Sequence, residues 1–344
     1  MKSGAAVFSK VKQANESFGK NSHAIWPKDL GCRFLISIDT EEEFDWDGPF
    51  QRSGHTNISV KKLQRFQSFV EKFDIKPVYF VDYSIVEDDE AAAFLKSVTE
   101  RDTASIGVHL HPWINPPFEE EVNSFNSFAG NLPKELEEKK ILNLRQVIEE
   151  KTGKRPVVYR AGRYGVGPNS IEILLKHGFT IDSSVRSRFD YSSESGPDFA
   201  HIGPEPFWLD KNRRLLELPL TTVFSGLLRK QADILSASFN RSSLIRGLFS
   251  KLKILERIPL TPEGVSAREA KEAIDVALDD QLNLLVFSFH SPSLSSGHTP
   301  YVQTDQDLDR FYDWWRSVID HLLERGVSPI GIDELMTASA IAPK

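Results

Sequence analysis

Apolar residues in this chain fall into two alternating patterns. Short unbroken runs of branched and aromatic residues are typical of strands buried on both faces, as in a parallel sheet. We therefore expect strands at RFLISID (33–39), KPVYFVD (76–82), ASIGVHLH (104–111), RPVVYRAG (155–162), FTIDSSV (179–185), LNLLVFSFH (282–290) and VSPIGI (327–332).

The stretches between these runs have apolar residues at spacings of three and four, which predicts helices with one buried side. The expected helices span 60–73, 89–98, a segment opening after Pro133, 171–177, 267–281 and 305–325. Gly178 and Gly326 follow two of them and are suited to end a helix. About seven strand–helix units predict an α/β fold with a parallel sheet, either closed as a barrel or open and doubly wound.

Three segments depart from the alternation. Residues 1–30 are polar and aperiodic and form an expected lead-in, which leaves one domain at 31–340. Residues 186–216 combine Ser, Gly, Pro and aromatic residues; they are either an inserted loop that shapes a binding site or a disordered segment, and the aromatic content favours the loop. Residues 241–257 predict a basic amphipathic helix that either packs on the domain or contacts an anionic membrane surface.

The composition excludes several classes of protein. With 42 basic and 49 acidic residues the net charge is −7, which argues against nucleic-acid binding. A single cysteine, Cys32, excludes an internal disulfide and a cysteine-cluster metal site. No apolar run is long enough for a transmembrane segment and the start lacks an export signal, so we expect a cytoplasmic protein.

Charged and imidazole side chains lie at the carboxyl ends of five expected strands, where parallel α/β folds form their sites. Side chains two apart on a strand share a face, so Asp39 and Glu41 can face one cleft, as can His109 and His111. The other residues at strand ends are Arg160, Asp182 and His290.

Two imidazoles and a carboxylate are the ligands of a catalytic divalent ion, most often zinc. His109, His111 and Glu41 form such a set. Asp39 is then the candidate general base, provided that a cation such as Arg160 holds its charge. Amide hydrolysis also needs an acid for the leaving nitrogen, and an imidazole such as His290 suits that task.

Several further residues allow more than one interpretation. We expect Glu42, Glu43 and Asp45 to form a solvated acidic turn. Trp113 is either an aromatic wall of the site or part of the core, and His298 either lies near the site or is structural. The aromatic residues of the 186–216 loop, among them Trp208, are suited to stack on a sugar ring and favour a sugar substrate.

Five blocks, SIDTEEEFDW, IGVHLHPW, YRAGRYGVGPNS, IDSSV and FSFHSPSL, give the chain a resemblance to the polysaccharide deacetylases of carbohydrate esterase family 4, the NodB-homology fold. The branch that it resembles most is a lipopolysaccharide-biosynthesis branch labelled WalW. This resemblance implies a distorted (β/α)7 barrel with a divalent metal, zinc foremost and cobalt, manganese or nickel otherwise. It also implies removal of an acyl group, usually acetyl, from the nitrogen of an amino sugar.

The resemblance also implies roles for individual residues. It makes Asp39 the base, Glu41 a metal ligand and His290 the histidine of the last block. Arg160 matches the arginine that steadies the base, with Asp182 in support. The turn near Arg163 and Tyr164 lies where a backbone N–H would help to hold an oxyanion.

Two blocks depart from the family pattern. The usual second metal histidine lies four residues after the first, and this slot is Trp113, while the second histidine here is His111. The usual first block has adjacent aspartates, whereas Thr40 here separates Asp39 from a glutamate. Both departures keep three metal ligands.

The sequence thus predicts a metal-dependent hydrolase acting on an N-acylated amino sugar of a surface polysaccharide or its precursor. An amidase of small cyclic or linear amides or ureides on the same fold is one alternative. A metal-free glycan-binding or assembly protein is another. The basic segment 241–257 would bring a lipid-linked precursor within reach if it contacts a membrane.

Overall fold

The computed structural model describes residues 23–46, 48–232 and 254–341. Its strands are β1 (Arg33–Thr40), β2 (Val78–Val81), β3 (Ser105–Leu110), β4 (Val158–Ala161), β5 (Ile181–Asp182), β6 (Phe207–Trp208), β7 (Leu216–Glu217), β8 (Thr222–Ser225), β9 (Glu256–Pro259), β10 (Leu284–His290) and β11 (Ser328–Pro329). Its α-helices are α2 (Val60–Val70), α3 (Tyr83–Glu87), α4 (Asp89–Glu100), α5 (Lys134–Thr152), α6 (Ser170–Lys176), α9 (Ala267–Asp279), α10 (Asp305–Glu324) and α11 (Ile332–Ile341).

One curled sheet organises the described chain. Its strands β10, β1, β2, β3, β4, β5 and β7 run parallel in that order, with β6 antiparallel at the far edge and β11 beside the start of β1. Between the two edges, the Thr221 amide donates to the Val286 carbonyl (3.1 Å) and the Ser288 amide to the Leu260 carbonyl (3.2 Å). The sheet is therefore the distorted (β/α)7 barrel of the prediction, closed in part by irregular chain.

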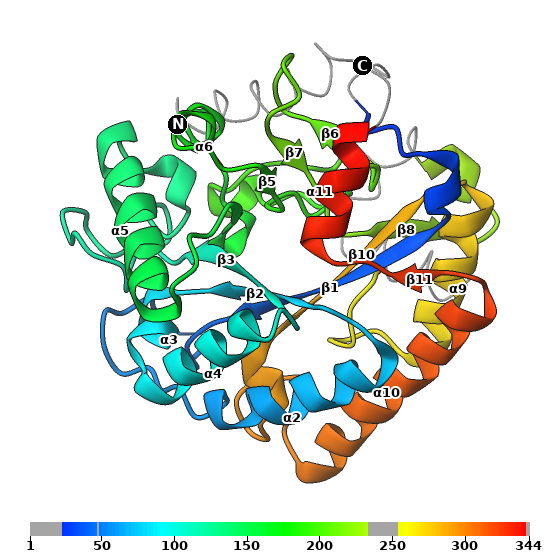
Figure 1. The fold of residues 1–344 in the computed structure, drawn as a ribbon, viewed down its shortest axis with the longest axis horizontal. Coiled ribbons are helices and arrows are strands. Elements are labelled where there is room, and N and C mark those ends of the chain that lie inside the picture. The colour runs from blue at the N-terminus through cyan, green and yellow to red at the C-terminus, as the bar shows by residue number, and fades with distance from the viewer. Residues whose placement is uncertain (1–22, 47, 233–253, 342–344) are drawn as a thin grey trace.

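Helices surround the curled sheet, with α5 and α4 on one side, α2 and α10 below, and α9 on the side opposite α5 (Figure 1). Their buried faces meet side chains from the strands. Phe66 of α2, for example, lies 4.9 Å from Phe289 of β10 and 6.1 Å from Trp315 of α10, measured between ring centroids. Within the described residues, no helix has both the length and the apolar character needed to cross a bilayer.

Local sequence signals account for where several helices begin and end. Ser266 and Glu269 form a reciprocal capping box at the start of α9, and Thr304 and Asp307 form another at the start of α10. Gly326 has a φ of +74°, which permits the sharp exit after α10. The helices expected from the sequence and most of the expected strands are confirmed by the structure.

Some elements differ from the expectations. The predicted strands at 179–185 and 327–332 shrink to the two-residue strands β5 and β11, and the short helices α3 and α11 were not predicted. Residues 186–216 form an ordered insertion, within which Phe199 and Phe207 are buried in the core. The predicted basic segment lies outside the described residues over 241–253, and its last two residues belong to strand β9.

Adjacent leucines near the end of α10 test how the helix packs. Leu322 is fully buried, whereas Leu323 is 46% exposed. We expect Leu322→Ala to lower the free energy of unfolding by about 2–5 kcal/mol, because it leaves a cavity in the core. The matched control Leu323→Ala should change it by about 0.5 kcal/mol or less. Urea denaturation measures both, and equal effects would contradict this packing of α10.

Candidate active site

A pocket of about 210 Å³ lies at the carboxyl end of the parallel strands. The strand register brings its residues together. Asp39 of β1 is aligned with His290 of β10, and His109 of β3 is aligned with Arg160 of β4. The pocket is lined by Asp39, Glu41, Phe44, Trp46, Phe50, His109, His111, Arg163, Tyr164 and His290.

Glu41, His109 and His111 meet at one point. They are buried, and one donor atom of each lies within 4.8 Å of the other two. The Nε2 atoms of both histidines lie 3.3 Å from the same Glu41 oxygen, Oε2. Two imidazole nitrogens and a carboxylate oxygen in this arrangement are suited to a divalent ion.

Neighbouring groups fix the direction of both imidazoles. The Nδ1 of His109 lies 3.2 Å from the Arg160 carbonyl, and the Nδ1 of His111 lies 2.9 Å from Glu42 Oε2. Trp113 stacks on the His111 ring at 4.3 Å and donates its indole N–H to Glu42. With Nδ1 engaged on each ring, Nε2 faces Glu41 on both, which is the orientation that metal-binding histidines adopt.

A second group of possible ligands, Glu42, Asp82 and His111, lies behind the first. The Asp82 oxygens accept hydrogen bonds from the backbone N–H groups of Glu42 (2.8 Å) and Ile85 (2.7 Å). Burial, followed by the nearby Glu42 charge, raises the pKa of Asp82 well above its ordinary value. Both Asp82 oxygens are thus engaged by backbone donors, so we assign this group to support of His111.

Asp39 is held by a fully buried guanidinium. Arg160 Nη1 donates to Asp39 Oδ1 and to Ser288 Oγ, while Nη2 donates to the hydroxyls of Ser37 and Ser183. Nε donates to the Ser183 carbonyl at 2.9 Å, so all the N–H groups of Arg160 are engaged. The Phe80 ring packs against the guanidinium at 4.1 Å.

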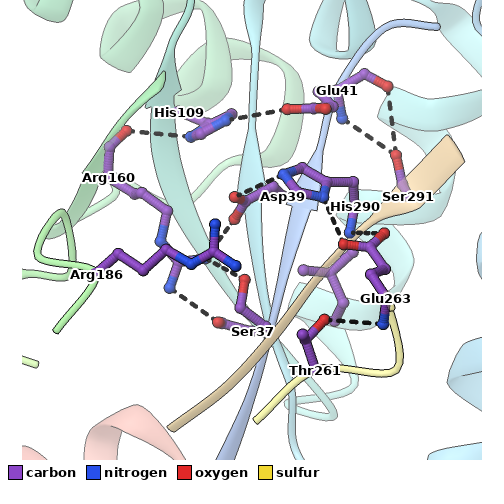
Figure 2. Close-up of polar contacts among 12 residues, drawn as sticks. Ser37, Asp39, Glu41, His109, Arg160, Arg186, Thr261, Glu263, His290 and Ser291 are labelled. Carbon is purple, nitrogen blue, oxygen red and sulfur yellow. Dashed lines mark hydrogen bonds and ion pairs between the residues drawn. The ribbon is translucent and has the colours of Figure 1, made fainter. Parts of the chain in front are cut away.

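His290 lies between two carboxylates (Figure 2). Its Nδ1 is 2.7 Å from Glu263 Oε2, and its Nε2 is 3.8 Å from Asp39 Oδ2. Glu263 also accepts hydrogen bonds from the His290 amide (3.1 Å) and the Ser293 hydroxyl (2.7 Å). This carboxylate therefore fixes the ring with Nε2 directed toward Asp39 and the pocket.

These surroundings shift the pKa values of the two groups in opposite directions. Burial alone would raise the pKa of Asp39, but the charge of Arg160 outweighs it and the pKa lies below the ordinary value. Burial would lower the pKa of His290, but Glu263, Glu41 and Asp39 raise it to about 10. At neutral pH the pocket thus holds an ionised carboxylate beside a protonated imidazole, a base and an acid.

No protein-family model and no curated protein matches the chain, but several solved structures are similar to it. Among solved structures, a protein from Mycobacterium smegmatis described as a polysaccharide deacetylase is 16% identical, covers 90% of this chain and 96% of its own, and has a TM-score of 0.47. A family 4 acetyl xylan esterase from Clostridium thermocellum, in complex with a cobalt ion, is 13% identical, covers 90% and 95%, and has a TM-score of 0.43. PuuE allantoinase is 15% identical, covers 89% and 95%, and has a TM-score of 0.45.

The turn after β4 contributes Arg163 and Tyr164 to the pocket wall. Both residues have positive φ angles, 54° and 58°, a conformation that is costly away from glycine and frequent at functional sites. Gly162, just before them, lies so close to His111 that any side chain there would overlap the imidazole. The sharp turn and the position of the His111 ring therefore depend on each other.

Four other predicted residues lie outside this pocket. Asp182 is buried beside β4, where it accepts a hydrogen bond from Ser184, and Ser184 in turn accepts one from the Ala161 amide. Trp113 is 2% exposed and packs behind His111. Trp208 is buried in the strand pair β6–β7, and His298 lies in the partly exposed loop before α10. Trp208 is thus not placed to stack on a substrate in the pocket.

The predicted acidic turn is wrong for two of its three residues. Glu42 is fully buried and holds His111, and Glu43 is 6% exposed and accepts hydrogen bonds from the backbone amides of Ile58 and Ser59 at the start of α2. Only Asp45 is exposed. Consecutive carboxylates are usually solvated, but here N–H groups from distant parts of the fold donate hydrogen bonds to Glu42 and Glu43.

Four residues that shape the site were not predicted from the sequence, namely Glu263, Phe44, Trp46 and Phe50. Glu263 lies in a Pro- and Gly-containing turn far from any expected strand end, and nothing in its local sequence indicates a role. Phe44 and Trp46 wall the pocket, and the Trp46 ring lies 5.0 Å from the His290 ring. Their signal was present in EEEFDW, directly after the candidate base and ligand.

Glu42 provides a test of the metal site. We expect Glu42→Gln to weaken zinc binding by about 10–100-fold, because the carboxylate that orients His111 is lost. Glu43→Gln, one residue away and equally buried, should leave the affinity unchanged. Competition with a chromophoric chelator measures both. Unaltered zinc affinity in Glu42→Gln would show that His111 is not held in this way.

Glu263 provides a test of the acid. Because Glu263 raises the pKa of His290, the protonated imidazole persists until the pH rises through about 10. In Glu263→Gln we expect the pKa to fall, so the alkaline limb of the kcat/KM profile should move to lower pH while zinc binding is kept. Asp275→Asn, which removes the carboxylate beside the distant His321, serves as the control. An alkaline limb at the same pH in Glu263→Gln and wild type would exclude this role.

Proposed function

We propose that this protein is a metal-dependent hydrolase that removes an N-acyl group, acetyl in the simplest case, from an amino sugar. One observation carries the proposal. The donor atoms of Glu41, His109 and His111 converge beside an ionised Asp39 and a protonated His290 in one pocket. This set would hold a metal and supplies a base and an acid, which together meet the requirements for hydrolysis of an unactivated amide.

The residues divide the reaction between them. A divalent ion bound by Glu41, His109 and His111 would supply Lewis acidity toward the amide carbonyl and an activated water. Asp39 accepts a proton from the attacking water, and Arg160 keeps it ionised until then. His290 donates its Nε2 proton to the amide nitrogen as the C–N bond breaks. The products are a carboxylic acid, acetic acid in the simplest case, and the free amine, so one water is consumed for each bond cleaved.

The substrate class rests on the pocket wall and on the sequence resemblance. Phe44, Trp46 and Phe50 present aromatic surface beside the catalytic groups, a surface suited to the apolar face of a sugar ring. The resemblance to family 4 carbohydrate esterases supports an N-acetylated glycan of the cell surface or its precursor. Its WalW-like branch would place that glycan in lipopolysaccharide biosynthesis. Zinc is the metal we propose, since two imidazoles and a carboxylate suit it.

Two expectations from the sequence stay predictions. The cytoplasmic location is one. The other is a membrane contact through segment 241–257, most of which lies outside the described residues.

Acetate release from a panel of N-acetylamino sugars and lipid- or nucleotide-linked glycans tests the proposal. We expect zinc-loaded wild type to release acetate, and Asp39→Asn to lower kcat by about 10²–10⁴-fold while still binding zinc, because only the base is removed. Asp74→Asn, at an exposed turn, is the control.

Other results would favour the alternatives. Acetate release that does not respond to Asp39→Asn would remove Asp39 from the reaction. Hydrolysis of a ureide such as allantoin, without any acetate release from sugars, would favour the small-amide hydrolase. Protein that binds glycan but no zinc would contradict an enzymatic role.

A further inference from the structure

A second cavity, of about 110 Å³, adjoins the catalytic pocket. Trp46, Tyr164 and His290 line both spaces, so the second cavity begins where the catalytic groups end. Arg186 lies on the wall of this second cavity together with Glu263 and His290, all three labelled in Figure 2. No role in the chemistry above uses this cavity.

Arg186 differs from the other arginine of the site. Arg160 uses every N–H group on partners within the protein, whereas within residues 23–46, 48–232 and 254–341 the Arg186 guanidinium makes one hydrogen bond, from Nη1 to the Tyr191 hydroxyl (3.2 Å). The guanidinium also packs on the Phe189 ring at 4.0 Å. Among the described residues, no carboxylate lies within ion-pair distance of it. It is a partly buried cation with donors to spare, and such a group is costly unless an anion joins it.

Three hydroxyl groups on this wall also have a hydrogen to donate. The hydroxyl oxygens of Thr221, Thr261 and Ser288 accept hydrogen bonds from Val286 N (2.8 Å), Glu263 N (3.2 Å) and Arg160 Nη1 (3.2 Å). Each of these hydroxyls thus already accepts one hydrogen bond, and its hydrogen is donated to no residue in the described part of the chain.

Trp46 and Glu263 also line this cavity. The Trp46 indole Nε1 is buried and has no acceptor within the described ranges. Glu263 brings a carboxylate to the wall, but its oxygens are engaged by the His290 ring and amide and by the Ser293 hydroxyl. Its negative charge is opposed by the protonated His290 beside it, so Glu263 does not neutralise Arg186.

We propose that this cavity, which we call the Arg186 subsite, binds a carboxylate carried by the sugar whose N-acyl group is removed. The inference rests on the proposed function and deepens it, because it makes the substrate an acidic N-acylamino sugar such as an amino uronic acid. The planar guanidinium presents two parallel N–H groups that match a carboxylate, and hydroxyl donors complete the recognition of its oxygens. The cavity shares a wall with the catalytic groups, so the carboxylate and the scissile amide belong to one sugar or to adjacent ones.

Three matched probes test the subsite: N-acetylglucosaminuronic acid, N-acetylglucosamine, and N-acetylglucosamine 6-phosphate. The first two differ only in a carboxylate against a hydroxymethyl group. Isothermal titration to the zinc-loaded full-length Asp39→Asn protein measures binding without turnover. We expect the uronic acid to bind about 10–100-fold more tightly than the neutral sugar, as for a hydrogen-bonded charge pair.

Variants of Arg186 in the same background show whether this preference comes from the subsite. Arg186→Gln should abolish the preference and leave neutral-sugar binding unchanged, and Arg186→Lys should restore part of it through charge alone. Arg188→Gln, two residues away and facing a different cavity, should keep it. Thermal melting shows whether each variant is folded. If Arg186→Gln does not fold, the partial preference expected of Arg186→Lys still tests the proposal.

Equal binding of the acidic and neutral sugars by the Asp39→Asn protein would overturn the proposal, as would a preference that survives in Arg186→Gln. Tighter binding of the 6-phosphate than of the uronic acid would also overturn it, in favour of a phosphate site. Acetate release by wild type is read separately. Loss of that activity with the acid preference intact would contradict the hydrolase and not the subsite.

Discussion

The site depends on one buried ion pair, between Arg160 and Asp39. A guanidinium and a carboxylate removed from water are stable only when their hydrogen-bonding groups are satisfied. Here the strands provide that satisfaction, since Ser37 of β1, Ser288 of β10 and Ser183 after β5 occupy the N–H groups that Asp39 leaves free. The curled sheet brings these strands around Arg160, so the fold and the ionised base require each other.

The same arrangement orients two imidazoles for different tasks. A carboxylate lies at Nδ1 of His111 and another at Nδ1 of His290, contributed by Glu42 and Glu263. In both cases Nε2 is left facing the pocket. What differs is the group opposite Nε2, which is Glu41 for His111 and Asp39 for His290. Under the proposed function, the first pair binds the metal and the second supplies an acid beside a base. Position in the barrel, more than residue type, therefore assigns each histidine its role.

The strand-end residues could be predicted from the sequence because they follow apolar runs directly. Parallel strands end at one edge of a sheet. The alternation of strands and helices was therefore enough to predict that Asp39, His109, Arg160 and His290 lie near each other. Helix boundaries followed equally local signals, such as the capping boxes of α9 and α10.

Residues whose roles depend on long-range contacts could not be predicted in this way. Glu42 is one of three consecutive glutamates, and nothing in the local sequence distinguishes it. It becomes a buried hydrogen-bond partner only because the fold brings His111, which follows β3, against it. Glu263 reaches His290 across 27 positions from a turn without a motif. The prediction that Trp208 stacks on the substrate is wrong for a related reason. An aromatic side chain is suited to a core strand as well as to stacking on a sugar ring.

The central claim is that Glu41, His109 and His111 hold one ion together. Anomalous diffraction at the zinc absorption edge, from crystals of the zinc-loaded protein, tests it most directly. The account predicts a single anomalous peak bonded to the Nε2 atoms of both histidines and to a Glu41 oxygen. A peak between Glu42, Asp82 and His111, or no peak within bonding distance of His109, would contradict it.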